Sequence, residues 1–219
     1  MQQSEAAAVY VTLRRYADFG ARMYEMVFRK VEAGLVPMLK GQPGFRSYCA
    51  LLTEDGDGVS VTVFDGREQA IEANGQALGW VQSNLRDLLP DAPEVIAGEC
   101  VLAEVAPGRS ASHDQRQPPY VVVREFQNLG PAEETREVAR RLALPLVTGS
   151  PGFRSVCMFR DEREPSHAAM VALFDTRADA LQAHERSMQA LRENAAAGGV
   201  AWPPPRVGVG RAIVFAAAD

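Results

Sequence analysis

Hydrophobic and polar residues follow two different periods along the first half of this 219-residue chain. A period of two, in which every second residue is apolar, predicts a β-strand, and a period near 3.6 predicts an amphipathic helix. We expect strands at residues 9–16, 45–53, 59–64 and 95–105. We expect helices at residues 18–35, with Asp18 as the cap, and from 65 towards 89, where Asp65 and Glu68 have capping-box spacing. The predicted order is therefore βαββαβ.

The same order occurs twice, because the chain contains an internal repeat. Residues 37–49 read PMLKGQPGFRSYC and residues 145–157 read PLVTGSPGFRSVC, with eight of thirteen positions identical at an offset of 108. The pattern FDxR recurs at residues 64–67 and 174–177. The second copy predicts strands near Tyr120, Phe153, Ala169 and Val207, and helices at 133–144 and 177–195. We expect two domains, residues 1–106 and 120–219, with a Pro-, Gly- and Ser-containing linker at 107–119.

A βαββαβ unit is typical of the ferredoxin-like fold, in which two helices cover one face of a four-stranded antiparallel sheet. The other face also needs cover here, because residues 45–52 have apolar side chains on both sides of the strand. Cys49 and Leu51 share one side, and Tyr48 and Ala50 share the other. The predicted fold class is α+β, with two tandem ferredoxin-like domains stacked sheet on sheet as an intramolecular pseudo-dimeric α/β barrel.

Composition narrows the function classes. The net charge is −5 and no basic run occurs, which excludes a typical nucleic-acid-binding protein. No apolar run approaches the roughly 18 residues of a membrane span, and the first residues do not resemble a signal peptide, so we expect a cytoplasmic protein without a membrane partner. Cys49, Cys100 and Cys157 are widely spaced and are expected to be buried free thiols. Neither a phosphate-binding glycine loop nor metal-ligand spacing occurs, and we expect no cofactor.

Three short patterns together resemble a known group of proteins. They are Pro-Gly-Phe before the second strand, Val-Phe-Asp-x-Arg at the end of the third, and WVxxNL at residues 80–85. The chain resembles the dimeric α/β-barrel superfamily, and more narrowly the antibiotic-biosynthesis monooxygenase (ABM)-like group. The resemblance implies a cofactor-independent monooxygenase acting on a small hydrophobic or aromatic molecule, whose anion reduces O₂ directly. The superfamily also contains haem-degrading enzymes, isomerases, peroxidases and members without known activity, and fold alone does not select among these.

Polar residues in apolar settings supply the candidate catalytic groups. Asn74 and His184 occupy the same position of an otherwise apolar stripe in the two copies; the stripes are Ile71, Asn74, Leu78, Val81, Leu85 and Leu181, His184, Met188, Leu191, Ala195. Asn74 could hydrogen-bond an oxyanion, and His184 could act as a general base. The alternative is that both are satisfied by neighbouring groups, without a catalytic role.

The candidate substrate-binding residues have structural alternatives as well. They are Tyr24, Tyr48, Arg46, Trp80 and Arg154. Trp80 is off the Asn74 face of its helix, which favours packing. Arg46 recurs as Arg154, and Arg14 recurs as Arg124, which favours pairing with carboxylates at the barrel rim.

Haem-degrading relatives use an axial histidine, which only His184 could supply, since His113 is in the linker and His167 is in a predicted hairpin loop. Two function classes remain: an oxidative enzyme, or a non-catalytic small-molecule-binding or structural barrel. A cavity of about 300 Å³ or more beside Asn74 or His184 would favour the enzyme. The expected partners are a small hydrophobic molecule and, if the chain is not a monomeric pseudo-dimer, a second copy of itself.

Overall fold

The computed structural model describes residues 9–17, 19, 24–89, 91–108 and 117–218. The predicted helix start at Asp18 and most of the linker, including His113, lie outside these ranges. The elements of the first half are β1 (Tyr10–Tyr16), α1 (Tyr24–Lys30), η1 (Val31–Leu35), α2 (Val36–Lys40), β2 (Phe45–Leu52), β3 (Gly58–Phe64), α3 (Arg67–Asn84) and β4 (Glu94–Val105). Those of the second half are β5 (Tyr120–Phe126), α5 (Ala132–Val138), η2 (Ala139–Ala143), α6 (Leu144–Thr148), β6 (Phe153–Arg160), β7 (Ala168–Phe174), α7 (Arg177–Ala196) and β8 (Arg206–Ala217).

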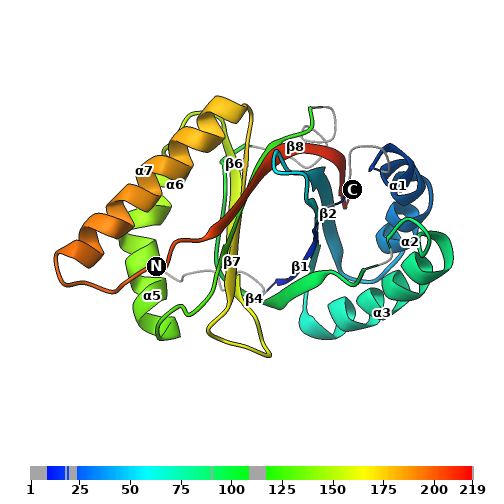
Figure 1. Ribbon diagram of the computed structural model, residues 1–219, viewed down its shortest axis with the longest axis horizontal. Coiled ribbons are helices and arrows are strands. Elements are labelled where there is room, and N and C mark those ends of the chain that lie inside the picture. The colour runs from blue at the N-terminus through cyan, green and yellow to red at the C-terminus, as the bar shows by residue number, and fades with distance from the viewer. Residues whose placement is uncertain (1–8, 18, 20–23, 90, 109–116, 219) are drawn as a thin grey trace.

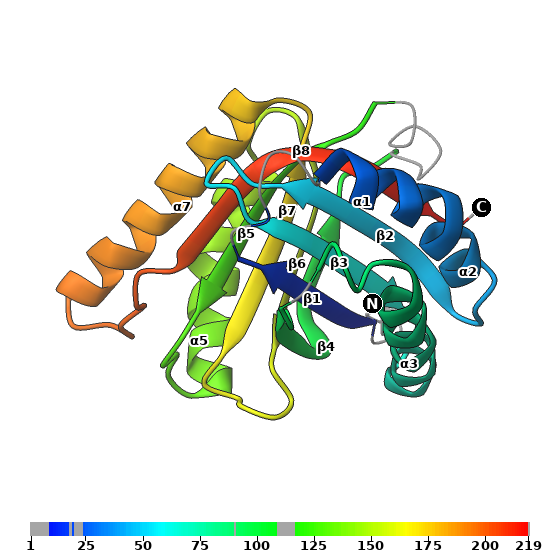
Figure 2. The same cartoon turned by 45° about the vertical axis from the view of Figure 1, so that its right-hand side comes forward.

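The eight strands close into an antiparallel barrel in the order β1-β3-β2-β8-β5-β7-β6-β4. Helices α1, α2 and α3 cover one outer side of the barrel, and α5, α6 and α7 cover the opposite side (Figures 1 and 2). The strand order within each half is the same, β4-β1-β3-β2 and β8-β5-β7-β6. The predicted α+β class and barrel are confirmed at this level.

The two longest strands join the halves, since each takes part in both. Residues 94–99 of β4 pair with β1, and its remaining residues pair with β6. In the same way, residues 206–211 of β8 pair with β5, and the rest of the strand pairs with β2. Gly98 and Gly210 lie at the transitions. A Cβ at Gly98 would lie 1.9 Å from the Arg160 carbonyl oxygen, so only glycine allows this backbone approach.

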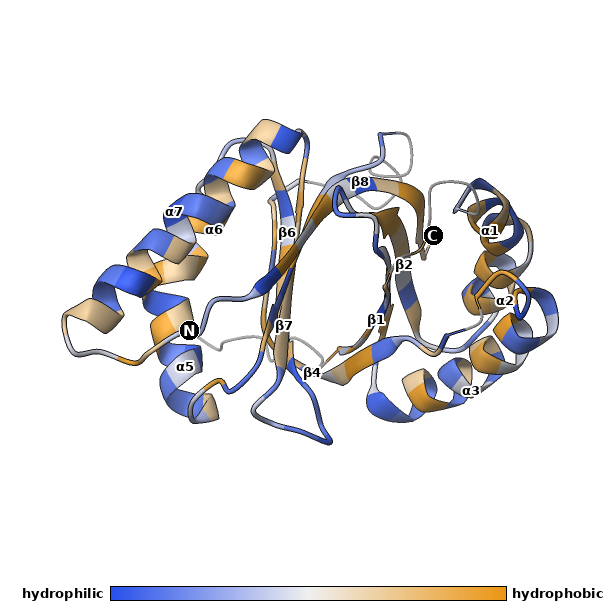
Figure 3. Ribbon diagram, viewed as in Figure 1, coloured by the Kyte–Doolittle hydropathy of each residue, from blue (hydrophilic) through white to orange (hydrophobic). Residues whose placement is uncertain are grey.

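The apolar residues form three separate cores. One fills the barrel between the two sheets and includes Val11, Leu13 and Leu51 of the first half with Val121 and Phe159 of the second. Each of the other two lies between a sheet and its own helices. Hydrophobic colour accordingly follows the strands and the inward sides of the helices (Figure 3). Both faces of the sheets are buried, as the pattern of residues 45–52 predicted.

The first helix of each half continues through a proline and past its predicted end, which was Leu35 in the first half and residue 144 in the second. Pro37 cannot donate a backbone hydrogen bond and would clash with the preceding turn of a regular helix. The chain accommodates it with a π-helical turn, in which the Val36 amide donates to the Val31 carbonyl. Pro145 follows an equivalent π-helical turn. The helices end at Lys40 and Thr148.

Helix α3 departs from the prediction at its start, on its buried face and at its end. Gly66 is the N-cap, without a side-chain cap, and Asp65 pairs with Arg46 instead. The buried residues are Ala70, Ala73 and Ala77, whereas Ile71 and Leu78 of the predicted stripe are 46% and 57% exposed. Small alanines allow the helix to lie close to the sheet, which rotates the larger residues towards its edge. The helix ends at Asn84 rather than near Leu89.

Candidate functional site

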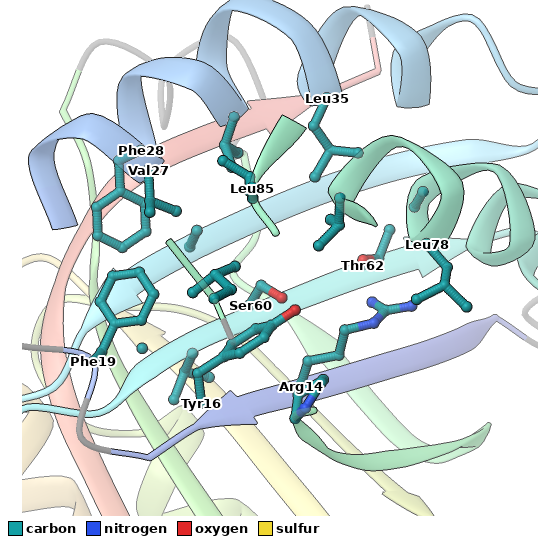
Figure 4. A pocket seen from close by; sticks show the side chains of 18 of the residues that line it. Arg14, Tyr16, Phe19, Val27, Phe28, Leu35, Ser60, Thr62, Leu78 and Leu85 are labelled. Atoms are coloured by element: carbon teal, nitrogen blue, oxygen red, sulfur yellow. The ribbon is translucent and has the colours of Figure 1, made fainter. Parts of the chain in front are cut away.

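A cavity of about 540 Å³ lies between the sheet and the helices of the first half. Its floor is formed by β1, β2 and β3, and α1, η1 and α3 lie over it (Figure 4). Residues of the segment after α3 complete the lining. Most lining side chains are apolar; they include Phe19, Val27, Phe28, Val31, Leu35, Leu39, Val81 and Leu85. The volume exceeds the about 300 Å³ expected of a small-molecule site.

Small residues on the strands leave this space open. Ala50, Gly58 and Ser60 line the floor at the centre of the cavity. Gly58 also determines one wall, because a Cβ there would lie 2.7 Å from the Phe19 ring. Phe19 can therefore lie directly on the strand and close that end, where Figure 4 shows its ring beside Phe28.

The charged residue at the floor is Arg14 of β1. Its Nη2 donates to Asn74 Oδ1 at 2.8 Å, and Asn74 Nδ2 donates to Thr12 Oγ1 at 2.9 Å. Both the oxygen and the nitrogen of the Asn74 amide are therefore hydrogen-bonded. Because Thr12 holds the amide, the amide in turn fixes the position of the guanidinium. No carboxylate of the described residues pairs with Arg14, although the sequence predicted such a partner at the rim. Within the described residues, the positive charge of this guanidinium at the floor of an apolar cavity is therefore not compensated by a carboxylate.

Burial shapes the protonation of the other polar groups there. The Tyr16 and Tyr48 side chains line the cavity beside Arg14. Burial raises the pKa of both phenols, so both are neutral hydrogen-bond donors at neutral pH. Burial also lowers the pKa of Arg14, which nevertheless stays charged because an arginine pKa starts so high. Charge and donors together favour a ligand oxygen that carries negative charge.

The second half has the same frame around a filled space. Arg124 of β5 corresponds to Arg14 at the repeat offset of 110, and its Nε donates to His184 Nδ1 at 2.9 Å. The cavity there measures only about 10 Å³. Met158 and Met170 occupy the positions that correspond to Ala50 and Ser60. Because they are larger, they fill the volume that the first half leaves open.

His184 is therefore not beside the large cavity. Partial burial, and the charges of Arg124 and Arg192, lower its pKa to about 4, so it is neutral at pH 7. A haem does not fit these residues, because about 10 Å³ accommodates roughly one water molecule. Among the described residues, no histidine lines the large cavity either.

The remaining predicted site residues do not come together. Tyr48 lines the cavity, and Tyr24 packs beside Phe28 without lining it. Trp80 packs on η1, where a Cβ at Gly34 would lie 2.6 Å from its ring, as the packing alternative predicted. Arg46 is exposed and pairs with Asp65, and Arg154 is buried and pairs with Asp175 at 2.8 Å, as the carboxylate-pairing alternative predicted.

Arg14 and Tyr16 are two polar lining residues that the sequence analysis did not propose as site residues. Their signal was present in the alternation of β1, which places Arg14 and Tyr16 on one face and Leu13 and Arg15 on the other. Which face meets a cavity depends on the packing of the helices and was not readable from that pattern.

No protein-family model and no curated protein matches this sequence, but solved structures share its fold. A structure described as an anthrone oxidase-like protein is 12% identical, with a TM-score of 0.63, and the match covers 98% of this chain and 94% of that one. A "putative monooxygenase" from Fusobacterium nucleatum is 9% identical, with a TM-score of 0.73 and coverage of 96% and 95%. A mutant chlorite dismutase from Candidatus Nitrospira defluvii, in complex with cyanide, is 12% identical, with a TM-score of 0.56 and coverage of 96% and 92%.

These likenesses concern the fold alone at such low identity. They extend over nearly the whole chain, so these solved structures share its eight-stranded barrel with outer helices. Within the described residues, no helix is long and apolar enough to cross a membrane. The same residues contain no cluster of three or more side chains suited to hold a metal ion.

Proposed function

We propose that the large cavity binds a small hydrophobic, aromatic molecule with an acidic hydroxyl or enolisable carbonyl group, and that the protein oxidises it as a cofactor-independent monooxygenase. The observation that carries the proposal is the geometry of Arg14. Its guanidinium lies at the floor of an apolar cavity of about 540 Å³ and has no carboxylate partner in the described structure. An anionic ring system supplies both the apolar surface and the missing negative charge.

The role of Arg14 in this proposal is to stabilise the substrate anion. A cation beside a phenolate or enolate lowers the pKa of the bound substrate, because it favours the charged form. Asn74 is a positioning residue, since it holds the guanidinium through Oδ1 and is itself held by Thr12. Removing one pre-organised donor of this kind typically costs about 10²–10³ in kcat.

The apolar walls have a second role, which is to keep water away from the carbanion. Electron transfer from a carbanion to O₂ competes with reprotonation by water, and a dry site favours the former. The overall reaction balances without an external reductant for an activated methylene: R₂CH₂ + O₂ gives R₂C=O + H₂O. The methylene loses two protons and four electrons, and O₂ supplies one atom to the product and one to water.

Anthrone is a suitable probe, because it is a tricyclic, enolisable molecule with such a methylene. We expect enzyme-dependent O₂ consumption and stoichiometric anthraquinone formation, followed with an oxygen electrode and by absorbance. Arg14→Met should lower kcat by roughly 100-fold, as for the loss of an oxyanion donor, and Arg14→Lys should retain part of the activity. Arg29→Gln is the matched control, because the Arg29 side chain is 82% exposed on α1.

Binding without turnover is the second candidate function. The observation that favours it is the shortage of bases, because among the described residues the lining contains no histidine and a single carboxylate, that of the exposed Asp91. Saturable anthrone binding that depends on Arg14, without O₂ consumption above the spontaneous rate, would establish this alternative. Absence of both binding and O₂ consumption would reject both functions for this class of ligand.

The tandem organisation is part of the same proposal. We infer that residues 1–106 and 120–219 are duplicated ABM-like, ferredoxin-like domains joined by the 107–119 linker, which the shared strand order and the recurrent π-helical turns support. We further propose that the chain works in the cytoplasm as a monomeric pseudo-dimer. Native mass spectrometry tests the oligomeric state, with a single 23.8 kDa species as the expected result and a dimer as the contrary one.

A further inference from the structure

The second half contains a buried positive charge that the proposed function does not use. Arg124 is 1% exposed, and within the described residues no carboxylate pairs with it. Its Nε donates to His184, and its Nη1 donates to Met170 Sδ at 3.3 Å. Its Nη2 is buried and has no hydrogen-bond partner in the described structure. A buried guanidinium with an unused donor is costly, so such groups normally have a counter-ion.

A second donor without a partner borders the same small space. Trp202 follows α7, and its ring packs edge-on against Phe126 with the centroids 5.2 Å apart. Its Nε1 is buried and has no acceptor in the described structure. Trp202 and Arg124 both line the cavity of about 10 Å³. Two residues, each with a buried and unsatisfied N–H group, therefore line one cavity of roughly atomic size.

The chemistry of the lining specifies what could satisfy them. Apart from Arg124 and Trp202, the lining side chains are aliphatic, aromatic or thioether groups. The Met170 sulfur already accepts from Arg124. A water molecule there would gain two donors but would find no strong side-chain acceptor for its own hydrogens. A monatomic anion accepts from both N–H groups, needs no acceptor and compensates the charge.

We propose that Arg124 and Trp202 form a binding site for a single halide ion, chloride under cellular conditions, inside the second half. The ion would act as a structural counter-ion, held by Arg124 Nη2 and Trp202 Nε1. His184 suits this arrangement, because its neutral Nδ1 accepts a hydrogen bond from Arg124 and so holds the guanidinium in place. A carboxylate at this position would neutralise the charge and compete with the halide ion. The inference does not depend on a ligand in the first half.

Bromide provides the direct test. Crystals of the full chain grown in bromide should show one anomalous peak within hydrogen-bonding distance of both nitrogens. In solution, a Trp80→Phe background leaves Trp202 as the only tryptophan. Bromide should quench its fluorescence saturably, and chloride should compete, whereas gluconate at the same ionic strength should not.

Variants assign the effect to the site. Arg124→Met should weaken bromide binding by about tenfold or more, since a charged donor is lost, and Arg29→Gln on the exposed face of α1 should not. A water without anomalous signal at the site, quenching that rises linearly without saturation, or equal effects of gluconate and chloride would each overturn the proposal. If Arg124→Met does not fold, the anomalous map and the chloride competition of the parent protein still decide.

Discussion

The two halves of the barrel share a frame and differ in what fills it. Each has the same strand order, a π-helical turn before a proline, and an arginine on its first strand that donates to a polar residue of its second long helix. The first half encloses about 540 Å³ and the second about 10 Å³. The comparison teaches that side-chain volume at a few strand positions, rather than backbone topology, decides whether this fold offers a pocket.

The halves also differ where they meet. Arg15 and Glu125 occupy corresponding positions, on the inward-facing rows of β1 and β5, and form a buried ion pair that Asp57 joins from the other side of Arg15 at 2.9 Å. A dimer of identical chains with this geometry would bring two identical residues together. One chain that contains both halves can place opposite charges there, so the asymmetry extends from the pocket to the interface between the sheets.

The largest effect is expected from breaking that charge pair. Arg15→Met leaves the buried Glu125 without its partner and should lower the free energy of unfolding by about 3–5 kcal/mol. The double variant Arg15→Met/Glu125→Leu should recover most of the loss, because the buried Glu125 charge is gone and Asp57 keeps its ion pair with Arg206 at 2.8 Å. Urea unfolding of the two variants checks this. Equal destabilisation of both would show that the charge is not the cause.

Opening the second half should come next in magnitude. Met158→Ala, which copies Ala50, and Met170→Ser, which copies Ser60, each remove buried volume and should each cost about 2–5 kcal/mol as single variants. The measurement is urea unfolding, followed by anthrone titration to test for a second binding site. Unchanged stability would contradict the assignment of these two methionines as the filling residues.

Closing the first half is the reverse experiment. Ala50→Met/Ser60→Met should lower anthrone affinity by about 100-fold, which corresponds to roughly 2.7 kcal/mol. The thermal midpoint should change little, because the new side chains enter space that is already open. Calorimetric titration and a melting curve measure the two effects. Retained affinity would place the ligand elsewhere.

The smallest expected effect is a pH dependence of the stability, which His184 can cause and the equivalent Asn74, which does not titrate, cannot. The native pKa of His184 is about 4, below the 6.5 of an unfolded histidine, so the unfolded state takes up a proton first as the pH falls. Stability should be full above pH 6.5 and decline towards pH 4, by about 1–2 kcal/mol once solvent screening of the half-exposed ring is allowed for. The variant His184→Asn has the asparagine of the first half at this position and should make the free energy of unfolding depend less on pH in this range. Urea unfolding at several pH values in chloride-free buffer measures the dependence. If the variant shows the same pH dependence of the free energy of unfolding, groups other than His184 cause the decline.

Much of the fold was predictable because its signals are local or repeated. Alternation in residues 9–16 and 59–64 located the strands within one or two residues, and apolar side chains on both faces of β2 predicted the stacked sheets. The passage of the first helix through Pro37 was missed, because a π-helical turn depends on helix packing rather than on local preference. The alanine face of α3 was missed for a related reason, since Ile71 looked like the buried residue until the close approach of helix and sheet excluded it.

The candidate site was predicted only in part. Asn74 and His184 were singled out as equivalent positions, and both hydrogen-bond an arginine of the sheet. Their catalytic role stays a prediction. The sequence analysis did not predict that Asn74 lies near a large cavity and His184 near a nearly filled one. The residues that cause this difference in volume are visible in the sequence; they are Ala50, Ser60, Met158 and Met170. Their significance depends on knowing that all four project towards the helices at corresponding positions.

The sequence by itself determined the repeat, the strand alternation and the apolar surfaces that require two sheets to stack. These follow from local period and composition, because each residue contributes to them independently of its distant neighbours. Only the tertiary structure decided which half is open and which arginines pair with a carboxylate of the described residues, as Arg15 does and Arg14 and Arg124 do not. The volume of a cavity and the pairing of a buried charge both depend on residues that are far apart in the chain. These residues come together only when the barrel closes.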